Sequence, residues 1–283
     1  MRIFDCFTFY NELDLLEVRL RELYDKVDQF VIVEATTTFT NRPKPLYFDD
    51  NHTRYAPWMD KIQHIVVDLP QSANAWDNET AQRNTILHGL NDAEPDDLVI
   101  VSDVDEIVRA EAIDAMKSMD QTIYALRMPI FNFKFNYMRV TPVQYDVWAM
   151  AARAQVFHDI GPNTLRSLRF NYFDSPYQFS NDGISVIEHA GWHFGYMGDE
   201  AYLRDKAQSF SHTEVNRPDF LAQIDVEKSI AERKEWNREQ TARYEIVNMT
   251  DYFPQAATAY ADFVLPNSGF DPLDFLPPFP YNK

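Results

Sequence analysis

The sequence predicts an α/β fold, in which a Rossmann-like central sheet is followed by a mixed-sheet extension. Within residues 1–120, four short apolar runs alternate with stretches of helical spacing, which is typical of parallel strands joined by crossover helices. The apolar runs are nearly continuous, as expected for strands that are buried on both faces. From residue 121 the pattern changes to short, aromatic-rich segments that read as further strands.

The first half of the chain is expected to alternate strand and helix. Residues 2–9 are rich in β-formers, and leucines at helical spacing follow them, with Asn11 as the expected N-cap. In sheets of this kind, ligands bind at the carboxyl ends of the strands, so the polar residues there form the candidate site. Further strands are predicted at residues 30–35, 62–68 and 98–102, and helices at residues 76–90 and 109–118.

The second half, residues 121–265, is expected to form a mixed sheet with polar helices. The prolines of the tail, residues 266–283, exclude a regular helix, so we expect the tail to pack extended over the surface or to be partly loose. We see no internal repeat and no flexible linker, which predicts a single domain over residues 1–283. Loops are expected at residues 161–163 and 181–183, and helices at residues 199–210 and 219–237.

Composition excludes some partners. The net charge of −18 repels nucleic-acid backbones and anionic membranes, although a divalent cation can reverse the local charge at a ligand site. Cys6 is the single cysteine, so no intramolecular disulfide can form and a reducing compartment is expected. The first residues do not read as a signal peptide, and no apolar run approaches the ~20 residues of a membrane span. We therefore expect a cytoplasmic protein; its oligomeric state is open.

The strongest chemical motif is Asp103-Val104-Asp105, which directly follows the apolar run 98–102. Residues two apart in an extended stretch point the same way, so both carboxylates are expected to project from the end of one buried strand. Paired carboxylates suit Mg²⁺ or Mn²⁺, which take their remaining ligands from water and substrate phosphates. Such an ion stabilises a departing diphosphate. The alternative is an acidic cluster that caps the following helix.

Other residues are candidate contacts of the same site. Arg83 can pair with a diphosphate or brace the two carboxylates; alone, it would be read as a solvent-exposed helix arginine. His193 can complete the metal shell, and the alternative is a structural histidine. Trp192 is a candidate to stack on a sugar ring. Further candidates without an assigned role are His212, Arg153, Arg166 and Arg169.

The motifs lie in longer blocks that in combination resemble glycosyltransferase family 17, which contains N-acetylglucosaminyltransferases. The resemblance implies a GT-A fold, inversion at the anomeric carbon, a UDP-sugar donor (UDP-N-acetylglucosamine) and a glycan acceptor. It makes residues 1–120 the nucleotide-sugar half and residues 121–265 the acceptor half. The blocks are residues 9–20, 30–35, 39–40, 44–46, 82–84, 101–106, 191–194 and 209–212.

The resemblance also implies roles for particular residues. The acidic pair would hold the ion, and Arg83 would support the diphosphate. Residues implied to lie near the nucleotide are Asn11, Glu12 and Glu34.

Inversion requires a base that removes the acceptor's proton, and the sequence offers several carboxylates without choosing among them. The candidates are Asp146, Glu188, Asp199 and Glu200. Two other functions are considered. One is a non-catalytic carbohydrate-binding protein on the same fold. The other is a metal-dependent phosphatase of the haloacid-dehalogenase type, which is disfavoured because the acidic pair follows the fourth strand rather than the first.

Overall fold

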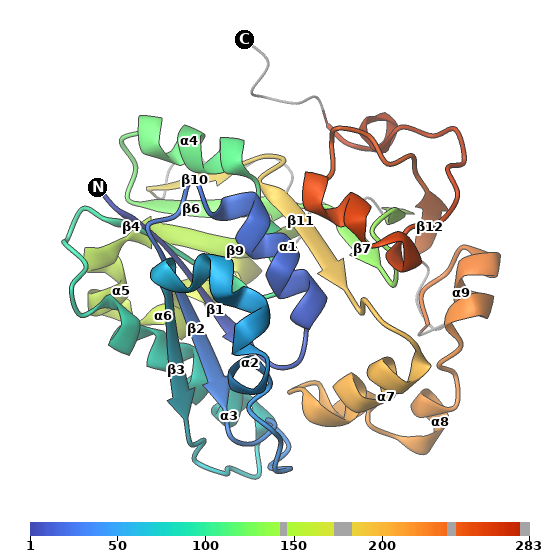
Figure 1. The fold of residues 1–283 in the computed structure, drawn as a ribbon, viewed down its shortest axis with the longest axis horizontal. Helices are drawn as coiled ribbons and strands as arrows, with labels where there is room; N and C mark the ends of the chain where they lie inside the picture. Colours follow the sequence, from blue (N-terminus) through green and yellow to red (C-terminus); the bar gives the residue numbers. More distant parts are fainter. Residues whose placement is uncertain (142–145, 173–182, 237–241, 278–283) are drawn as a thin grey trace.

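The computed structural model describes residues 1–141, 146–172, 183–236 and 242–277. Within them the chain forms two sheets with helices packed around them (Figure 1), so the predicted α/β class is confirmed. The first sheet has seven strands in the order β10-β6-β9-β4-β1-β2-β3. These strands are β1 (Ile3–Phe9), β2 (Gln29–Ala35), β3 (Ile62–Val67), β4 (Leu98–Asp103), β6 (Ile123–Met128), β9 (Asp146–Arg153) and β10 (Ile184–Ile187).

The four strands predicted in the first half are present and parallel. β1 lies between β2 and β4, and β3 pairs with the far side of β2. β9 is antiparallel to both β4 and β6, and β10 pairs parallel with β6. Three strands from beyond residue 120 therefore complete the first sheet, and the two halves of the sequence are not separate layers.

The second sheet has five strands in the order β12-β8-β7-β11-β5. It is mixed, as predicted, because β11 pairs antiparallel with β5 and parallel with β7. In Figure 1, β11 leads from the first sheet toward the lobe that holds α7, α8, α9 and β12. The strands of the second sheet are β5 (Glu106–Val108), β7 (Ile130–Asn132), β8 (Tyr137–Thr141), β11 (Gly191–Gly195) and β12 (Arg243–Ile246).

The helices are short and lie around the two sheets. No helix in the described ranges is both long and apolar enough to cross a membrane. The α-helices are α1 (Leu13–Leu23), α2 (Tyr47–Asp50), α3 (Ala75–Asn84), α4 (Ala110–Ser118), α5 (Ala154–Ile160), α6 (Pro162–Ser167), α7 (Glu200–Ser209), α8 (Pro218–Leu221) and α9 (Val226–Glu232). The 3₁₀ segments are His52–Lys61, Thr85–Leu90, Leu168–Tyr172, Thr213–Val215, Gln255–Ala259, Ala261–Phe263 and Pro272–Phe275.

Several predicted boundaries are wrong. The N-cap of α1 is Glu12 rather than Asn11, and it makes no side-chain cap. The helix predicted over residues 76–90 is α only to Asn84 and then tightens to 3₁₀. The loop predicted at residues 161–163 is mostly the start of α6, where Pro162 suits the first helical turn. The helix predicted at residues 219–237 is two short helices, α8 and α9. Residues 181–182 of the other predicted loop lie outside the described ranges.

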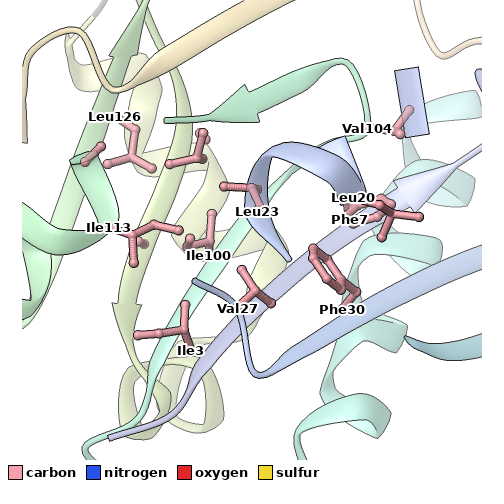
Figure 2. Packing of buried hydrophobic residues seen from close by; sticks show 14 of the residues in the cluster. Ile3, Phe7, Leu20, Leu23, Val27, Phe30, Ile100, Val104, Ile113 and Leu126 are labelled. Carbon is pink, nitrogen blue, oxygen red and sulfur yellow. The ribbon is translucent and has the colours of Figure 1, made fainter. Parts of the chain in front are cut away.

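The core lies on both faces of the first sheet, which explains the continuous apolar runs. Alternate residues of a strand point to opposite faces. Phe7 and Ile100 therefore pack with α1 and α4 on one face, while Cys6 and Val101 pack with α5 and α6 on the other. Figure 2 shows the first of these layers, with Leu20 of α1 among the sheet side chains.

The second sheet has its own apolar clusters. One contains Trp192 and Phe194 together with the segment around Phe253. The tail packs beside this cluster as far as Pro277, whose carbonyl accepts a hydrogen bond of 2.6 Å from His189 Nε2. The tail contains a short 3₁₀ turn rather than being extended throughout. Residues 278–283 of the tail lie outside the described ranges.

Candidate active site

The acidic turn connects the two sheets. β4 of the first sheet ends at Asp103, and β5 of the second begins at Glu106. The turn is held from both sides, because the Asp103 amide donates to Glu106 Oε2 over 2.9 Å and the Phe194 amide of β11 donates to the Asp105 carbonyl over 2.8 Å. Both aspartates of the motif therefore lie at the junction of the sheets.

Arg19 of α1 fixes this turn from inside the protein. Its side chain is fully buried and pairs with Asp5 of β1 over 2.5 Å. Arg19 Nη1 donates to the carbonyls of Asp103 and Glu106 over 3.0 and 2.9 Å, and its Nη2 donates to Ser102 Oγ over 2.6 Å. A single guanidinium thus binds backbone carbonyls on both sides of the turn.

Asp103 is braced by two arginines. Arg83 Nη2 of α3 lies 2.9 Å from Asp103 Oδ1, and Arg166 Nη2 of α6 lies 3.1 Å from Oδ2. Burial acts to raise the pKa of Asp103, but Arg83 and Arg166 outweigh it and hold that pKa well below its usual range. Asp103 is therefore a permanent anion with both oxygens engaged. Of the two roles considered for Arg83, bracing the acidic motif is the one that the geometry shows.

Asp105 faces a different set of groups. Lys206 Nζ of α7 lies 2.9 Å from Asp105 Oδ2, and His193 Nε2 of β11 lies 3.9 Å from Asp105 Oδ1. Burial lowers the pKa of Lys206, but Asp105 outweighs it and leaves that pKa raised, so the ammonium stays charged. A fixed cation and an imidazole thus share one carboxylate.

His193 is held as a neutral imidazole. Its ring packs against Trp148 with the ring centroids 4.1 Å apart. Burial is the main cause that lowers the pKa of His193 to about 4, against the opposing effect of Asp105. A neutral imidazole can offer a lone pair to a metal ion. Its Nδ1 is buried and has no hydrogen-bond partner among the described residues.

Asp103, Asp105, Lys206 and His193 line one cavity of about 390 Å³, which is a typical size for a small-molecule site. One end lies against the parallel strands and carries Trp76 and His212, whose rings are 4.7 Å apart. The other end lies against the second sheet and carries Asn132, Arg139 and Glu235. The acidic turn lies in the lining between them, so the cavity joins two chemically different ends.

The sequence-predicted residues divide into two groups. The structure brings five of them, together with His212 and Arg169, to the cavity; the other predicted residues do not line it. The five are Glu12, Arg83, Asp103, Asp105 and His193.

Glu34 and Asn11 are not in the cavity wall. Glu34 is fully buried and accepts hydrogen bonds from Lys44 Nζ and His64 Nε2, both over 3.1 Å. It thus anchors the segment that contains Lys44, which does line the cavity. Asn11 lines a neighbouring hollow of about 320 Å³. Of these two residues, Lys44 lies in the cavity wall and Glu34 lies behind it.

The predicted sugar contact of Trp192 is corrected. Its side chain is 1% exposed and packs in the core of the second sheet, where Arg109 lies 4.3 Å from its ring centroid. Neighbouring residues of a strand point to opposite faces, so His193 faces the cavity and Trp192 faces away. Among the described residues, the tryptophans that line the cavity are Trp76 and Trp148, and Trp148 is the one that packs against His193.

None of the four carboxylates predicted as the base lines the cavity. Asp199 caps α7 by accepting from the Tyr202 amide over 2.9 Å, and Glu200 is exposed. Glu188 pairs with Arg127 over 2.9 Å. Asp146 is buried at the start of β9.

Sequence reasoning missed Lys206 and Glu235. Both lie in segments that were predicted as polar helices, and no motif distinguishes them from surface residues there. Arg166 was left without a role, and the structure gives it one. It pairs with Glu106 over 2.5 Å as well as with Asp103.

Comparison with known sequences identifies relatives. The model of glycosyltransferase family 17 matches residues 1–268. The β-1,4-mannosyl-glycoprotein 4-β-N-acetylglucosaminyltransferase of Rattus norvegicus is 29% identical, over 68% of this chain and 39% of that protein. The Homo sapiens enzyme of the same name is also 29% identical, over 68% of this chain and 40% of that protein. The chain therefore spans about two fifths of the length of these curated relatives.

Solved structures give weaker likenesses. The galactosyltransferase LgtC, in complex with donor and acceptor sugar analogues, is 12% identical over 66% of this chain and 73% of that chain, with a TM-score of 0.35. The glycosyltransferase GlyE of Streptococcus pneumoniae TIGR4 is 14% identical over 94% of this chain and 60% of that chain, with a TM-score of 0.39. Scores this low assign neither a function nor a site.

Proposed function

This chain belongs to glycosyltransferase family 17, and from that premise we propose that it is a glycosyltransferase. We propose that it transfers N-acetylglucosamine from UDP-N-acetylglucosamine to a glycan acceptor with inversion. The curated relatives are named for a 4-β-linked N-acetylglucosamine product. An α-linked UDP-sugar gives a β-linked product by inversion at the anomeric carbon. Because the chain spans about two fifths of those relatives, the acceptor is proposed only as a class.

The observation that carries the donor proposal is the grouping of Asp105, Lys206 and His193 in one cavity wall. A nucleoside diphosphate leaves with negative charge, and a preorganised cation stabilises that charge in the transition state. Lys206 is such a cation, since its salt bridge with Asp105 holds its ammonium in the cavity. We place the diphosphate beside it.

The donor's nucleoside is assigned to the end of the cavity that lies against the parallel sheet. Trp76 and His212 offer ring surfaces there, and aromatic side chains pack well against a planar base. The sugar then extends toward the end that carries Asn132, Arg139 and Glu235. This orientation puts the acceptor on the side of the second sheet.

The residues at the centre of the cavity fit a divalent ion that has few protein ligands. Asp105 supplies a carboxylate oxygen and His193 a neutral imidazole nitrogen, 3.9 Å apart. No group of three or more potential ligand side chains converges within the described ranges, so diphosphate oxygens and water would complete the shell, as is common for Mg²⁺. Asp103, whose two oxygens each meet an arginine, is the weaker ligand. A bound Mn²⁺ or Mg²⁺ would neutralise charge on the leaving diphosphate.

A thermal-shift panel of nucleotides and nucleotide sugars, with and without Mn²⁺, tests this proposal. A ligand that binds only the folded state raises the apparent melting temperature by mass action. We expect UDP and UDP-N-acetylglucosamine to give the largest shifts, and we expect these shifts to grow with Mn²⁺. Asp105→Asn should abolish the increment that Mn²⁺ adds.

The matched control is Asp68→Asn. Asp68 is also an aspartate that directly follows a parallel strand, but it is exposed and outside the cavity wall. The Asp68→Asn variant should leave every ligand-induced thermal shift unchanged. Equal Mn²⁺ increments in the wild type and in Asp105→Asn would overturn the metal assignment alone. A panel in which UDP compounds give no shift would overturn the donor.

A further inference from the structure

Glu235 is a half-buried carboxylate residue at the acceptor end of the cavity. It lies three residues beyond the end of α9 and lines the cavity with Asn132 and Arg139. Its backbone neighbours are fixed. The Lys234 carbonyl accepts a hydrogen bond from Tyr137 Oη over 2.9 Å, and Trp236 is 3% exposed and packs against Tyr196. The carboxylate is therefore held in place by its surroundings.

The two oxygens of Glu235 have different surroundings. Asn132 of β7 and Arg139 of β8 lie near the carboxylate. Glu235 Oε2 is buried and has no hydrogen-bond partner among the described residues. A buried carboxylate oxygen without a donor is costly. An oxygen of this kind in a ligand cavity points to a ligand group that donates a hydrogen bond, such as a sugar hydroxyl.

Asn132 also links Glu235 to the centre of the cavity. A Cβ added at Gly195 would lie 2.8 Å from Asn132 Oδ1 and 3.6 Å from His193 Nε2, so both side chains converge above this glycine. Tyr196 provides a second link. Its ring centroid lies 5.7 Å from Lys206 Nζ, and burial together with the charge of Glu235 raises its pKa. The carboxylate thus lines the same cavity as the groups assigned to the leaving diphosphate, together with residues of the second sheet.

We propose that Glu235 is the catalytic base that accepts the proton of the acceptor hydroxyl; this inference rests on the proposed function. As the acceptor oxygen forms its bond to the anomeric carbon, the bond from that carbon to the diphosphate oxygen breaks. The hydroxyl proton passes to Glu235 Oε2, and the electron pair of the broken bond leaves with UDP.

The electrostatic surroundings are consistent with this role. Burial raises the pKa of Glu235, while Arg139 and Asn132 oppose the rise. A base whose pKa lies closer to neutral pH takes up a proton more readily in the transition state. The other titratable groups near it are Tyr137, Tyr196 and Tyr244. Because the base acts in its ionised form, the rate is expected to fall as pH drops through the pKa of Glu235.

The test compares Glu235→Gln with the wild type, using UDP-N-acetylglucosamine alone and measuring release of UDP with water as the acceptor. We expect the variant to release UDP ~10²–10⁴-fold more slowly, with an unchanged UDP-induced thermal shift. The wild-type rate should rise as pH increases through the raised pKa of Glu235, and the variant should lose that dependence. Glu232→Gln is the matched control, because Glu232 is an exposed carboxylate at the end of α9. This variant should behave as the wild type.

The outcomes separate the base from the donor. If Glu235→Gln binds UDP and releases it at the wild-type rate, Glu235 is not the base. If the variant loses the UDP-induced shift as well as the rate, Glu235 has a structural or binding role instead. If the wild type shows no UDP-induced shift, the donor assignment fails, and the base assignment fails with it.

Discussion

Arg19 shows how a single buried side chain can fix a site without lining it. It forms a salt bridge of 2.5 Å with Asp5, and both side chains are 0% exposed. The same guanidinium donates to three carbonyls of residues 103–106. Removing one partner of a buried pair leaves the other charge without compensation, which costs about 3–5 kcal/mol.

We therefore expect Arg19→Met to lower the free energy of unfolding by about 3–5 kcal/mol, measured by urea denaturation. Arg21→Met on the same helix is the control. Arg21 is 52% exposed and pairs with Glu17, and exposed pairs contribute at most about 1 kcal/mol. Equal stability of the two variants would show that the Arg19 network does not support the acidic turn.

Lys206 gives a second prediction for a single residue. Removing a preorganised charge-stabilising donor typically lowers kcat by about 10²–10³-fold, so we expect Lys206→Met to slow UDP release from UDP-N-acetylglucosamine by about that factor. Lys206→Arg keeps the charge and should lose less. Lys228→Met, on the exposed side of α9, should leave the rate unchanged. A wild-type rate in Lys206→Met would remove Lys206 from the site.

At the scale of an element, β11 assigns opposite tasks to neighbouring residues. Trp192 and Phe194 face a core cluster, while His193 faces the cavity. This division follows from the period of two in a strand. The aromatic character of residues 191–194 reflects packing as well as ligand binding.

Two variants of β11 test this division. Trp192→Phe should lower the free energy of unfolding by about 1–3 kcal/mol through lost core volume and should keep the UDP-induced thermal shift. His193→Ala should do the opposite, keeping most of the stability and losing the Mn²⁺-dependent part of the shift. Loss of UDP binding in Trp192→Phe at unchanged stability would instead support the sugar contact predicted from the sequence.

At the scale of the whole molecule, the two halves of the sequence share one sheet. β4 of the first half pairs with β9 of the second over residues 98–101 and 150–153. The core layer of Figure 2 likewise combines Ile3 and Ile100 with Leu126. Removing the second half would expose this layer and leave β4 with an unpaired edge.

We therefore expect a fragment of residues 1–120 not to fold alone, and the full chain to unfold in one cooperative transition. Circular dichroism during thermal denaturation measures both. A cooperative transition in the fragment, or two separate transitions in the full chain, would show that the halves are independent domains.

The sequence by itself determined the four parallel strands of the first half of the chain and the acidic motif. A strand buried on both faces must be apolar throughout, so β1, β2 and β4 could be recognised without their partners. Asp103 and Asp105 are marked by their position directly after such a strand. These signals are local, since the residues that carry them are neighbours in the chain.

Only the tertiary structure decided what surrounds that motif. Lys206 is 101 residues from Asp105 in sequence, and Glu235 reaches the cavity from beyond α9. A polar helical pattern predicts residues that face water. The wall of a polar cavity contains the same residue types, so the pattern does not distinguish the two. The choice of Trp148 over Trp192 likewise depended on which face of each strand met the cavity. Local spacing cannot specify contacts between distant elements, because packing of the two sheets creates them.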